Sequence, residues 1–398
     1  MVGAPVVCPT ARSGGTRMPT SSRPRTVVRS LAGISTAAVV LAGCGLTEGK
    51  PGVEGAIAVT ATDSECQVAR TEAPAGQIEF TVRNTGTKVN EFYVYAEGDR
   101  VMGEVENIGP GLERRFLVRL DEPGTYETAC KPGLVGQGIR APFTVTGEAV
   151  DKTDDERLVE ATDAYQRYVS SQADAFESET ERFVAAVKRG DVTEAKRLYP
   201  RARVYWERIE PVAESFGDLD PKIDGREDVI DEGMRFTGYH RLERDLWKTG
   251  LREDSATIAD QLLEDVRTLV SRAKEVELDE LQLVNGSKAL LDEIATGKIT
   301  GEEERYSHTD LWDFDANLDG STAAIQALRP YLEEEDPELV ERIDERTKAL
   351  ETLLAKHQRG DGWAPYTDLS TDEVKALSKA LDALSEEVAK VAGVVGTR

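Results

Sequence analysis

The pattern of hydrophobic and polar positions changes near residue 150. Before that point, apolar residues alternate with polar ones over short stretches, as in strands that bury one face. The alternating sets are Ile57/Val59, Ile78/Phe80/Val82, Phe116/Val118/Leu120 and Phe143/Val145. Turn sequences such as Asn84-Thr85-Gly86 and Glu122-Pro123-Gly124 separate them. About seven short strands in roughly 95 residues predict a small β-sandwich over residues 56–147.

Beyond residue 150 the apolar positions follow helical spacing. A capping-box sequence, Thr153-Asp154-Asp155-Glu156, opens a first helix that is expected to continue to Gly190. Further helices are expected at about 192–215, 227–249, 254–275, 278–297, 310–333, 337–358 and 371–393. The chain is therefore predicted to be multidomain, with an all-β sandwich followed by an all-α helical bundle over residues 153–396.

Composition agrees with this division. Glycine occurs 15 times in residues 45–147 and only 14 times in the much longer segment 148–398, so the first part is rich in turns and the second is not. The length of 398 residues also exceeds what one ordinary domain holds.

The first 44 residues have the features of a signal peptide. They contain five arginines, no Asp or Glu, and a short apolar run that ends in Leu41-Ala42-Gly43-Cys44. This ending resembles the lipobox of bacterial lipoproteins, which implies that Cys44 becomes the lipidated N-terminus and that residues 45–55 are a linker. A plain secretory signal is the alternative. We expect an extracytoplasmic protein that is lipid-anchored to the outer face of the bacterial cytoplasmic membrane, at the cell surface or in the periplasm.

The charge excludes one class of partner and favours another. The chain has 49 basic and 74 acidic residues, a net charge of −25, which becomes −30 without the five arginines of the signal segment. Binding of a nucleic-acid backbone needs a basic surface, so nucleic acid is excluded as a partner. A strongly acidic protein outside the membrane instead attracts cations.

Two cysteines remain as candidate thiols in the folded body, because Cys8 leaves with the signal and Cys44 would be lipidated. In an exported protein, Cys66 and Cys130 form either a disulfide or a metal-binding pair.

The segment before Cys130 resembles the cupredoxin fold. Pro123-Gly124-Thr125-Tyr126 leads into Cys130, and Asn90-Glu91-Phe92 follows an earlier strand. A blue-copper site needs two histidines, but His240, His308 and His357 all lie in the helical part. The remaining set is Cys66, Glu91 and Cys130, which could hold copper or another transition metal, and the disulfide stays open as the alternative.

Two short sequences in the helical part pair potential ligands at a spacing of three residues. Glu207 and Glu210 form one pair, and His240 and Glu243 form the other. Residues three apart share a helix face, so each pair could converge on one ion. Each pair alone is a weak signal, because acidic helix faces are usually only solvated.

The order of four motifs strengthens this signal. They are Tyr-Trp-Glu-Arg-Ile-Glu-Pro from Tyr205, Phe-Gly-Asp-Leu-Asp from Phe216 leading to Asp224, Gly-Tyr-His-Arg-Leu-Glu from Gly238, and Tyr-Ser-His-Thr-Asp-Leu-Trp-Asp from Tyr306. Together they resemble the EfeO branch of the imelysin-like family. The resemblance implies an extracytoplasmic component of a ferrous-iron uptake system that works with an iron permease and a haem peroxidase partner.

We expect six residues to form the iron site of the bundle. They are Glu207, Glu210, Asp224, His240, Glu243 and Asp310, with His308 either supporting them or serving only the helix start. Such an oxygen-rich set suits a hard cation such as Fe³⁺ better than it suits Zn²⁺. Whether Fe²⁺ or Fe³⁺ is the bound form stays open.

Two other functions remain as alternatives: an imelysin-like zinc metallopeptidase, and a non-catalytic polysaccharide-binding or structural lipoprotein. A common zinc protease helix supplies two histidines with a glutamate between them, whereas the present motif supplies one histidine. We therefore expect a binding protein without catalytic residues, although metal oxidation at the β domain stays open.

Overall fold

The structure is a computed structural model and describes residues 55–151, 153, 155–217, 219–228, 230 and 234–396. The predicted signal peptide, the lipidation at Cys44 and nearly all of the predicted linker lie outside the described residues. The two parts described below belong to one compact unit, Gly52–Arg398.

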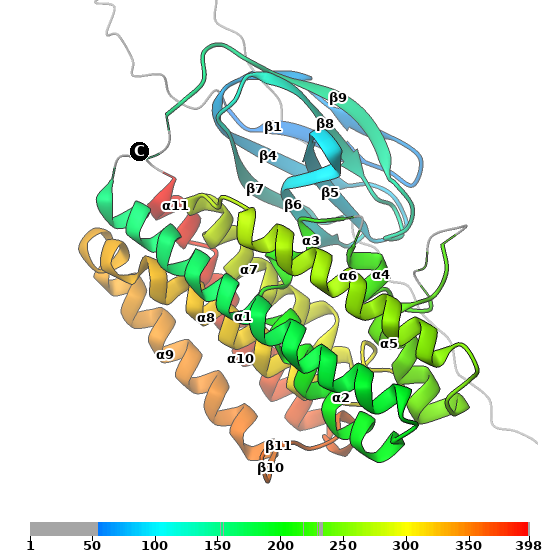
Figure 1. The fold of residues 1–398 in the computed structure, drawn as a ribbon. Helices are drawn as coiled ribbons and strands as arrows, with labels where there is room; N and C mark the ends of the chain where they lie inside the picture. The colour runs from blue at the N-terminus through cyan, green and yellow to red at the C-terminus, as the bar shows by residue number, and fades with distance from the viewer. Residues whose placement is uncertain are drawn as a thin grey trace, which may run out of the picture. The chain divides into compact units, whose positions relative to one another are not determined.

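The first part is a two-sheet β-sandwich (Figure 1). One sheet has the strand order β2-β1-β4-β7, with bounds Cys66–Val68, Ile57–Ala61, Gly76–Asn84 and Glu113–Leu120. The other has the order β3-β9-β8-β5-β6, with bounds Glu72–Pro74, Ile139–Thr146, Gly124–Cys130, Asn90–Ala96 and Arg100–Ile108. Four phenylalanines that the alternation places inward fill the space between the sheets, namely Phe80, Phe92, Phe116 and Phe143. The sandwich has two more strands than the seven predicted, namely β2 and β3. Each of these has only three residues, which is too short to show an alternating pattern.

The second part is mostly helical, with one short pair of strands, β10 (Gln358–Arg359) and β11 (Gly362–Trp363), so the predicted order of a β part and an α part is confirmed. Its helices are α1 (Glu156–Lys188), α2 (Val192–Glu207), α3 (Glu210–Glu214), α4 (Asp220–Ile223), α5 (Gly238–Arg244), α6 (Ser255–Glu275), α7 (Glu280–Thr296), α8 (Asp310–Glu335), α9 (Pro337–Leu354), α10 (Thr371–Val388) and α11 (Val391–Val395). The long helix α1 packs along α2, α6 and α8. Its cap is Asp155, whose side chain accepts a hydrogen bond from the amide of Arg157, and not Thr153 as the capping box predicted.

Two predicted helices are interrupted at positions that shape the site, and a third, expected at 371–393, divides into α10 and α11. The expected helix 192–215 breaks between Glu207 and Glu210, because Pro211 has no amide to continue the ladder of α2. The expected helix 227–249 begins only at Gly238, whose φ of 78° is left-handed. A Cβ there would lie 2.3 Å from the carbonyl oxygen of Ile223, so this close approach requires glycine.

Among the described residues, none of the helices is long and apolar enough to cross a membrane. The sandwich and the bundle contact each other through β7 and α7. Arg119 forms a 2.6 Å ion pair with Glu280, and the side-chain amide of Asn285 donates a hydrogen bond to the carbonyl oxygen of Leu117 at 2.6 Å.

Candidate metal centre

Five of the six predicted iron ligands come together in the bundle. Potential ligand atoms within 4.8 Å of one another fall into three overlapping groups: Glu207, Glu210, Asp224 and Glu303; Asp224, His240 and Glu303; and His240, Glu243 and Glu304. Asp224 is the C-cap of α4, and the others come from α2, α3, α5 and the loop before α8. The shared members make the three groups one continuous centre.

The spacing of Glu207 and Glu210 predicted that they share one helix face. This prediction is wrong, because the two residues lie on two different helices. Glu207 ends α2 and Glu210 begins α3. Asn317 of α8 holds the two residues together. Its side-chain amide donates hydrogen bonds to the carbonyl oxygen of Glu207 at 2.8 Å and to Oε2 of Glu210 at 2.9 Å. The helix break therefore turns both carboxylates towards the same buried space.

His240 and Glu243 do share one face of α5, as predicted. Nδ1 of His240 lies 3.2 Å from Oε2 of Glu243, and Nε2 lies 3.6 Å from Oδ1 of Asp224, which is too long for a hydrogen bond. The amides of Tyr306 and Ser307 donate to Oε1 of Glu243 at 2.8 and 2.7 Å and fix its orientation. Burial alone would lower the pKa of His240, but these carboxylates outweigh it and raise the pKa to about 10.

Two ligand candidates were missed from the sequence. Glu303 and Glu304 belong to the run Glu302-Glu303-Glu304, which as sequence indicates a solvated acidic loop. In the structure Glu302 is exposed, whereas Glu303 and Glu304 are 5% and 0% exposed and join the centre. The available signal was their place just before the Tyr-Ser-His-Thr-Asp sequence, from which only Arg305 separates them.

Arg203 is a buried counter-ion of the centre. Its guanidinium pairs with Glu207 at 2.5 Å, with Glu304 at 2.7 Å and with Glu303 at 3.4 Å, and it also bonds to Asp224. The side chain is fully buried. Burial alone would raise the pKa of Asp224, but Arg203 and then His240 lower it well below its usual range.

Lys298 is a second buried counter-ion. Its Nζ lies 3.0 Å from Oε1 of Glu303, 3.2 Å from Oε1 of Glu210 and 3.3 Å from Oε2 of Glu207. A fourth carboxylate, Glu293, is 3.7 Å away. Arg203 and Lys298 thus compensate part of the negative charge of the acid cluster. Without such cations, burial of so many carboxylates would cost much free energy.

Asp310, the sixth predicted ligand, lies beside the centre and in none of its ligand groups. It starts α8, and its Oδ1 accepts a hydrogen bond from the amide of Glu304 at 3.1 Å, so it positions the loop that carries Glu304. His308 is likewise outside the groups. It adopts a φ of 58°, and its carbonyl oxygen accepts a hydrogen bond from the amide of Tyr366.

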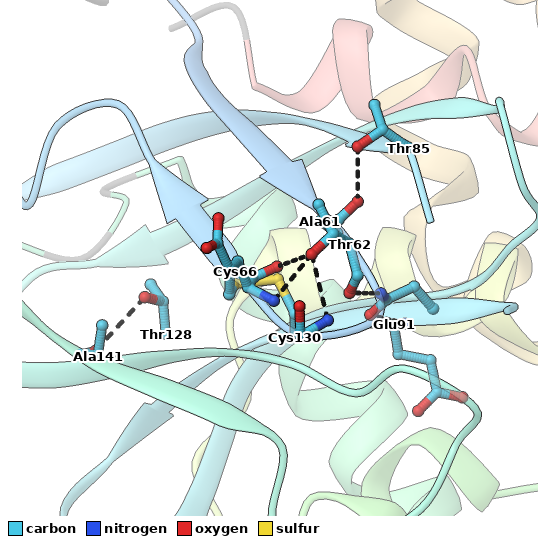
Figure 2. The surroundings of a disulfide bond; sticks show 11 residues. Ala61, Thr62, Cys66, Thr85, Glu91, Thr128, Cys130 and Ala141 are labelled. Carbon is cyan, nitrogen blue, oxygen red and sulfur yellow. Dashed lines mark hydrogen bonds between the residues drawn. A yellow bond between two sulfur atoms is a disulfide. The ribbon is translucent and has the colours of Figure 1, made fainter. Parts of the chain in front are cut away.

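The β domain does not bring its three predicted ligands together. Cys66 and Cys130 form a disulfide, and the carboxylate of Glu91 points away from it (Figure 2). The cause is strand alternation, since Phe92 pairs with Cys130 in the core and the preceding residue must face the other side. The oxidised sulfurs offer no thiolate, so the metal alternative applies only to a reduced form.

Glu91 instead lines a cavity of about 690 Å³ that also borders the candidate metal centre. The sandwich contributes Glu91, Glu104 and Glu106 to its wall, and the bundle contributes Glu210 and Glu303, among other residues. Burial, followed by the charge of Glu91, raises the pKa of Glu104 to about 8. The centre therefore adjoins an acidic cavity that can admit a cation.

Comparison with known proteins agrees with this arrangement. The family model described as imelysin matches residues 161–391, and the cupredoxin-like domain model matches residues 34–144. The chain is 38% identical over 347 residues to the iron uptake system component EfeO of Escherichia coli O157:H7, covering 85% of this chain and 91% of that protein. The proteins of the same name from E. coli strain K12 and Shigella flexneri match to the same extent. The chain belongs to the EfeO family.

Membership of the EfeO family confirms the resemblance seen in the four motifs, and the two matched models confirm the predicted fold class. The EfeO relatives carry the name of an uptake component, although the family model that matches the helical part of this chain is that of imelysin.

The buried acids of this EfeO chain predict a pH dependence of stability. Burial raises the pKa of Glu304 to about 8 and that of Asp310 to about 6. At pH values between the ordinary pKa of the carboxyls in the unfolded chain and their raised pKa in the folded protein, the folded protein binds more protons than the unfolded chain does. The free energy of unfolding of the metal-free protein should therefore fall as the pH rises from about 4.5 to about 8. His240 acts in the same direction, because its stabilising contribution is complete below about 6.5 and is lost as the pH rises through about 10.

Urea unfolding in the presence of a chelator at several pH values measures this dependence. Glu304→Gln should flatten the fall, and Glu302→Gln, which changes an exposed neighbour, should leave it as in the wild type. Rising stability between pH 5 and pH 8, or an unchanged slope in Glu304→Gln, would contradict the prediction.

Proposed function

We propose that this protein is the extracytoplasmic iron-binding component of a ferrous-iron uptake system, which captures iron at the carboxylate-rich centre and passes it to a membrane permease. One observation carries the proposal: six carboxylates and one imidazole form a continuous group, buried except for the half-buried Asp224, with ligand atoms within 4.8 Å in each of its three parts. The names of the EfeO relatives supply the iron uptake role.

The chemistry of the donors fits a hard cation. Carboxylate oxygens dominate and His240 is the single nitrogen ligand, whereas zinc sites in proteins rely on histidine and cysteine. Among the described residues, Nε2 of His240 and Oε2 of Glu303 are buried without a hydrogen-bond partner. Buried polar atoms are normally satisfied, so these two atoms support a ligand position inside the centre.

This donor set also argues against the peptidase alternative. A zinc peptidase keeps an open metal position and a general base that is free to act on water. Here Glu243 is held by two backbone amides, and Glu207 and Glu303 are each paired with both Arg203 and Lys298. Carboxylates held by amides or by cationic side chains are not free to act as the general base of a peptidase.

The setting of the protein follows from the same proposal. A lipid anchor at Cys44 would keep the protein at the outer face of the cytoplasmic membrane, next to the permease, and a haem peroxidase would be the second partner. The charge of −25 for the whole chain would raise the local concentration of cations around it.

Iron binding by matched variants tests the function. Glu303→Gln should weaken iron affinity by about 10- to 100-fold or more, because it removes a carboxylate shared by two ligand groups. Affinity is measured by competition with a chromogenic chelator, with Fe²⁺ under anaerobic conditions and with Fe³⁺ supplied as citrate. Glu302→Gln is the control, since Glu302 is the exposed neighbour and lies outside the ligand groups.

Two results would count against the proposal. Wild-type protein that binds neither Fe²⁺ nor Fe³⁺ would exclude an iron-binding role. Equal affinities of wild type, Glu303→Gln and Glu302→Gln would show that iron binds elsewhere.

A further inference from the structure

The ammonium group of Lys298 lies where a cation would sit. Its Nζ is 3.0 to 3.3 Å from oxygens of Glu303, Glu210 and Glu207. These three carboxylates, with Asp224, make up the largest of the ligand groups. The Lys298 side chain is 1% exposed, so water does not take its place as the partner of these acids.

We propose that Lys298 is a tethered competitor for the metal: its ammonium holds the cation position of the metal-free protein and must withdraw when the ion binds. This inference rests on the proposed function and names the residue that regulates how tightly the centre binds its metal. A metal ion and an ammonium group cannot share the same three carboxylates, because like charges at this distance repel strongly in a buried site. The affinity of the centre is therefore set by the exchange of one cation for the other.

Lys298 is better suited to withdraw than Arg203. The Arg203 guanidinium is a planar fork that pairs with several carboxylates at once and lies 6.0 and 5.8 Å from the rings of Tyr199 and Tyr239. Lysine carries a compact charge on a flexible stem and forms no such fork. Arg203 is thus a fixed counter-ion, and Lys298 is the displaceable one.

Glu293 provides a place for the displaced ammonium. Its Oε2 is 3.7 Å from Nζ of Lys298, and its side chain is 19% exposed, whereas those of Glu207 and Glu210 are 0% and 6% exposed. Glu293 also lines the acidic cavity. A short movement towards Glu293 would keep the lysine paired and free the inner carboxylates. When the ion leaves, the returning ammonium would compensate the acids again, which favours release to a partner.

The competition predicts that removing the lysine charge strengthens metal binding. Lys298→Met keeps the length of the side chain and should raise the affinity for Fe²⁺ under anaerobic conditions by about 10- to 100-fold. Lys298→Arg keeps the charge and should bind no tighter than the wild type. Lys288→Met is the matched control, because Lys288 pairs with Asp292 on the partly exposed face of α7 and should leave affinity unchanged.

A second readout separates competition from a purely structural role. Without metal, Lys298→Met should melt at a lower temperature than the wild type, because its carboxylates lose their counter-ion. Saturating Fe²⁺ should then raise its melting temperature by more than it raises that of the wild type. Weaker or unchanged Fe²⁺ affinity in Lys298→Met, with a wild type that binds normally, would overturn the competitor role. Absence of binding in the wild type would instead overturn the iron-binding function itself.

Discussion

Replacing Arg203 with methionine should lower the free energy of unfolding of the metal-free protein by about 3–5 kcal/mol. Arg203 is fully buried and forms ion pairs with Glu207, Asp224 and Glu304, as well as a longer one with Glu303. Its removal leaves these carboxylates desolvated without their cation, and a buried charge that has lost its partner is far more costly than a broken surface pair.

Arg201 offers a matched control on the same helix. It pairs with Asp361, whose side chain is 87% exposed, so Arg201→Met should change stability only slightly. The comparison is made by urea unfolding at neutral pH with a chelator present, and then with iron. Iron should restore part of the stability of Arg203→Met, since a bound ion replaces the missing positive charge. If Arg203→Met is as stable as Arg201→Met, the acids of the centre do not depend on this counter-ion.

Removal of the disulfide should have an effect of similar size. Cys66 and Cys130 are 64 residues apart in sequence, and closing a loop of that length contributes about 4 kcal/mol to stability in the chain-entropy model. The double variant Cys66→Ala/Cys130→Ala should therefore lose about 2–5 kcal/mol of its free energy of unfolding. Unfolding is measured in urea with intrinsic fluorescence as the readout.

Reductant provides the control for this variant. Wild-type protein should lose stability when a thiol reductant is added, whereas the double variant should not respond. Equal stability of the oxidised wild type and the variant would show that the bridge adds nothing. Cu²⁺ added to the reduced wild type tests the open metal alternative, because copper bound to a thiolate gives a charge-transfer absorption that the double variant cannot give.

Most of the fold could be predicted from the sequence because the signals are local. A period of two in Ile78, Phe80 and Val82 requires a strand with one buried face, and helical spacing after residue 155 requires an amphipathic helix. The errors lie at breaks such as the one before Pro211. There a single residue interrupts the backbone ladder while the apolar pattern continues.

The candidate centre was predicted only in part. Glu207, Glu210, Asp224, His240 and Glu243 carry their own signals, through short spacing or through motifs that match the EfeO family. No local pattern tells a buried acid from a solvated one. The sequence therefore did not distinguish Glu303 from its exposed neighbour Glu302, nor did it indicate that Asp310 would face the loop backbone.

The sequence by itself thus determined the two fold classes, their order along the chain and the acidic character of the protein, and it singled out five residues of the candidate centre. The tertiary structure alone decided which further acids are buried and which cations compensate them. The pairs between Arg203 and Glu303 and between Lys298 and Glu210 join residues 100 and 88 positions apart. The strength of such pairs depends on how completely the surrounding helices exclude water, and that is a property of the packed molecule.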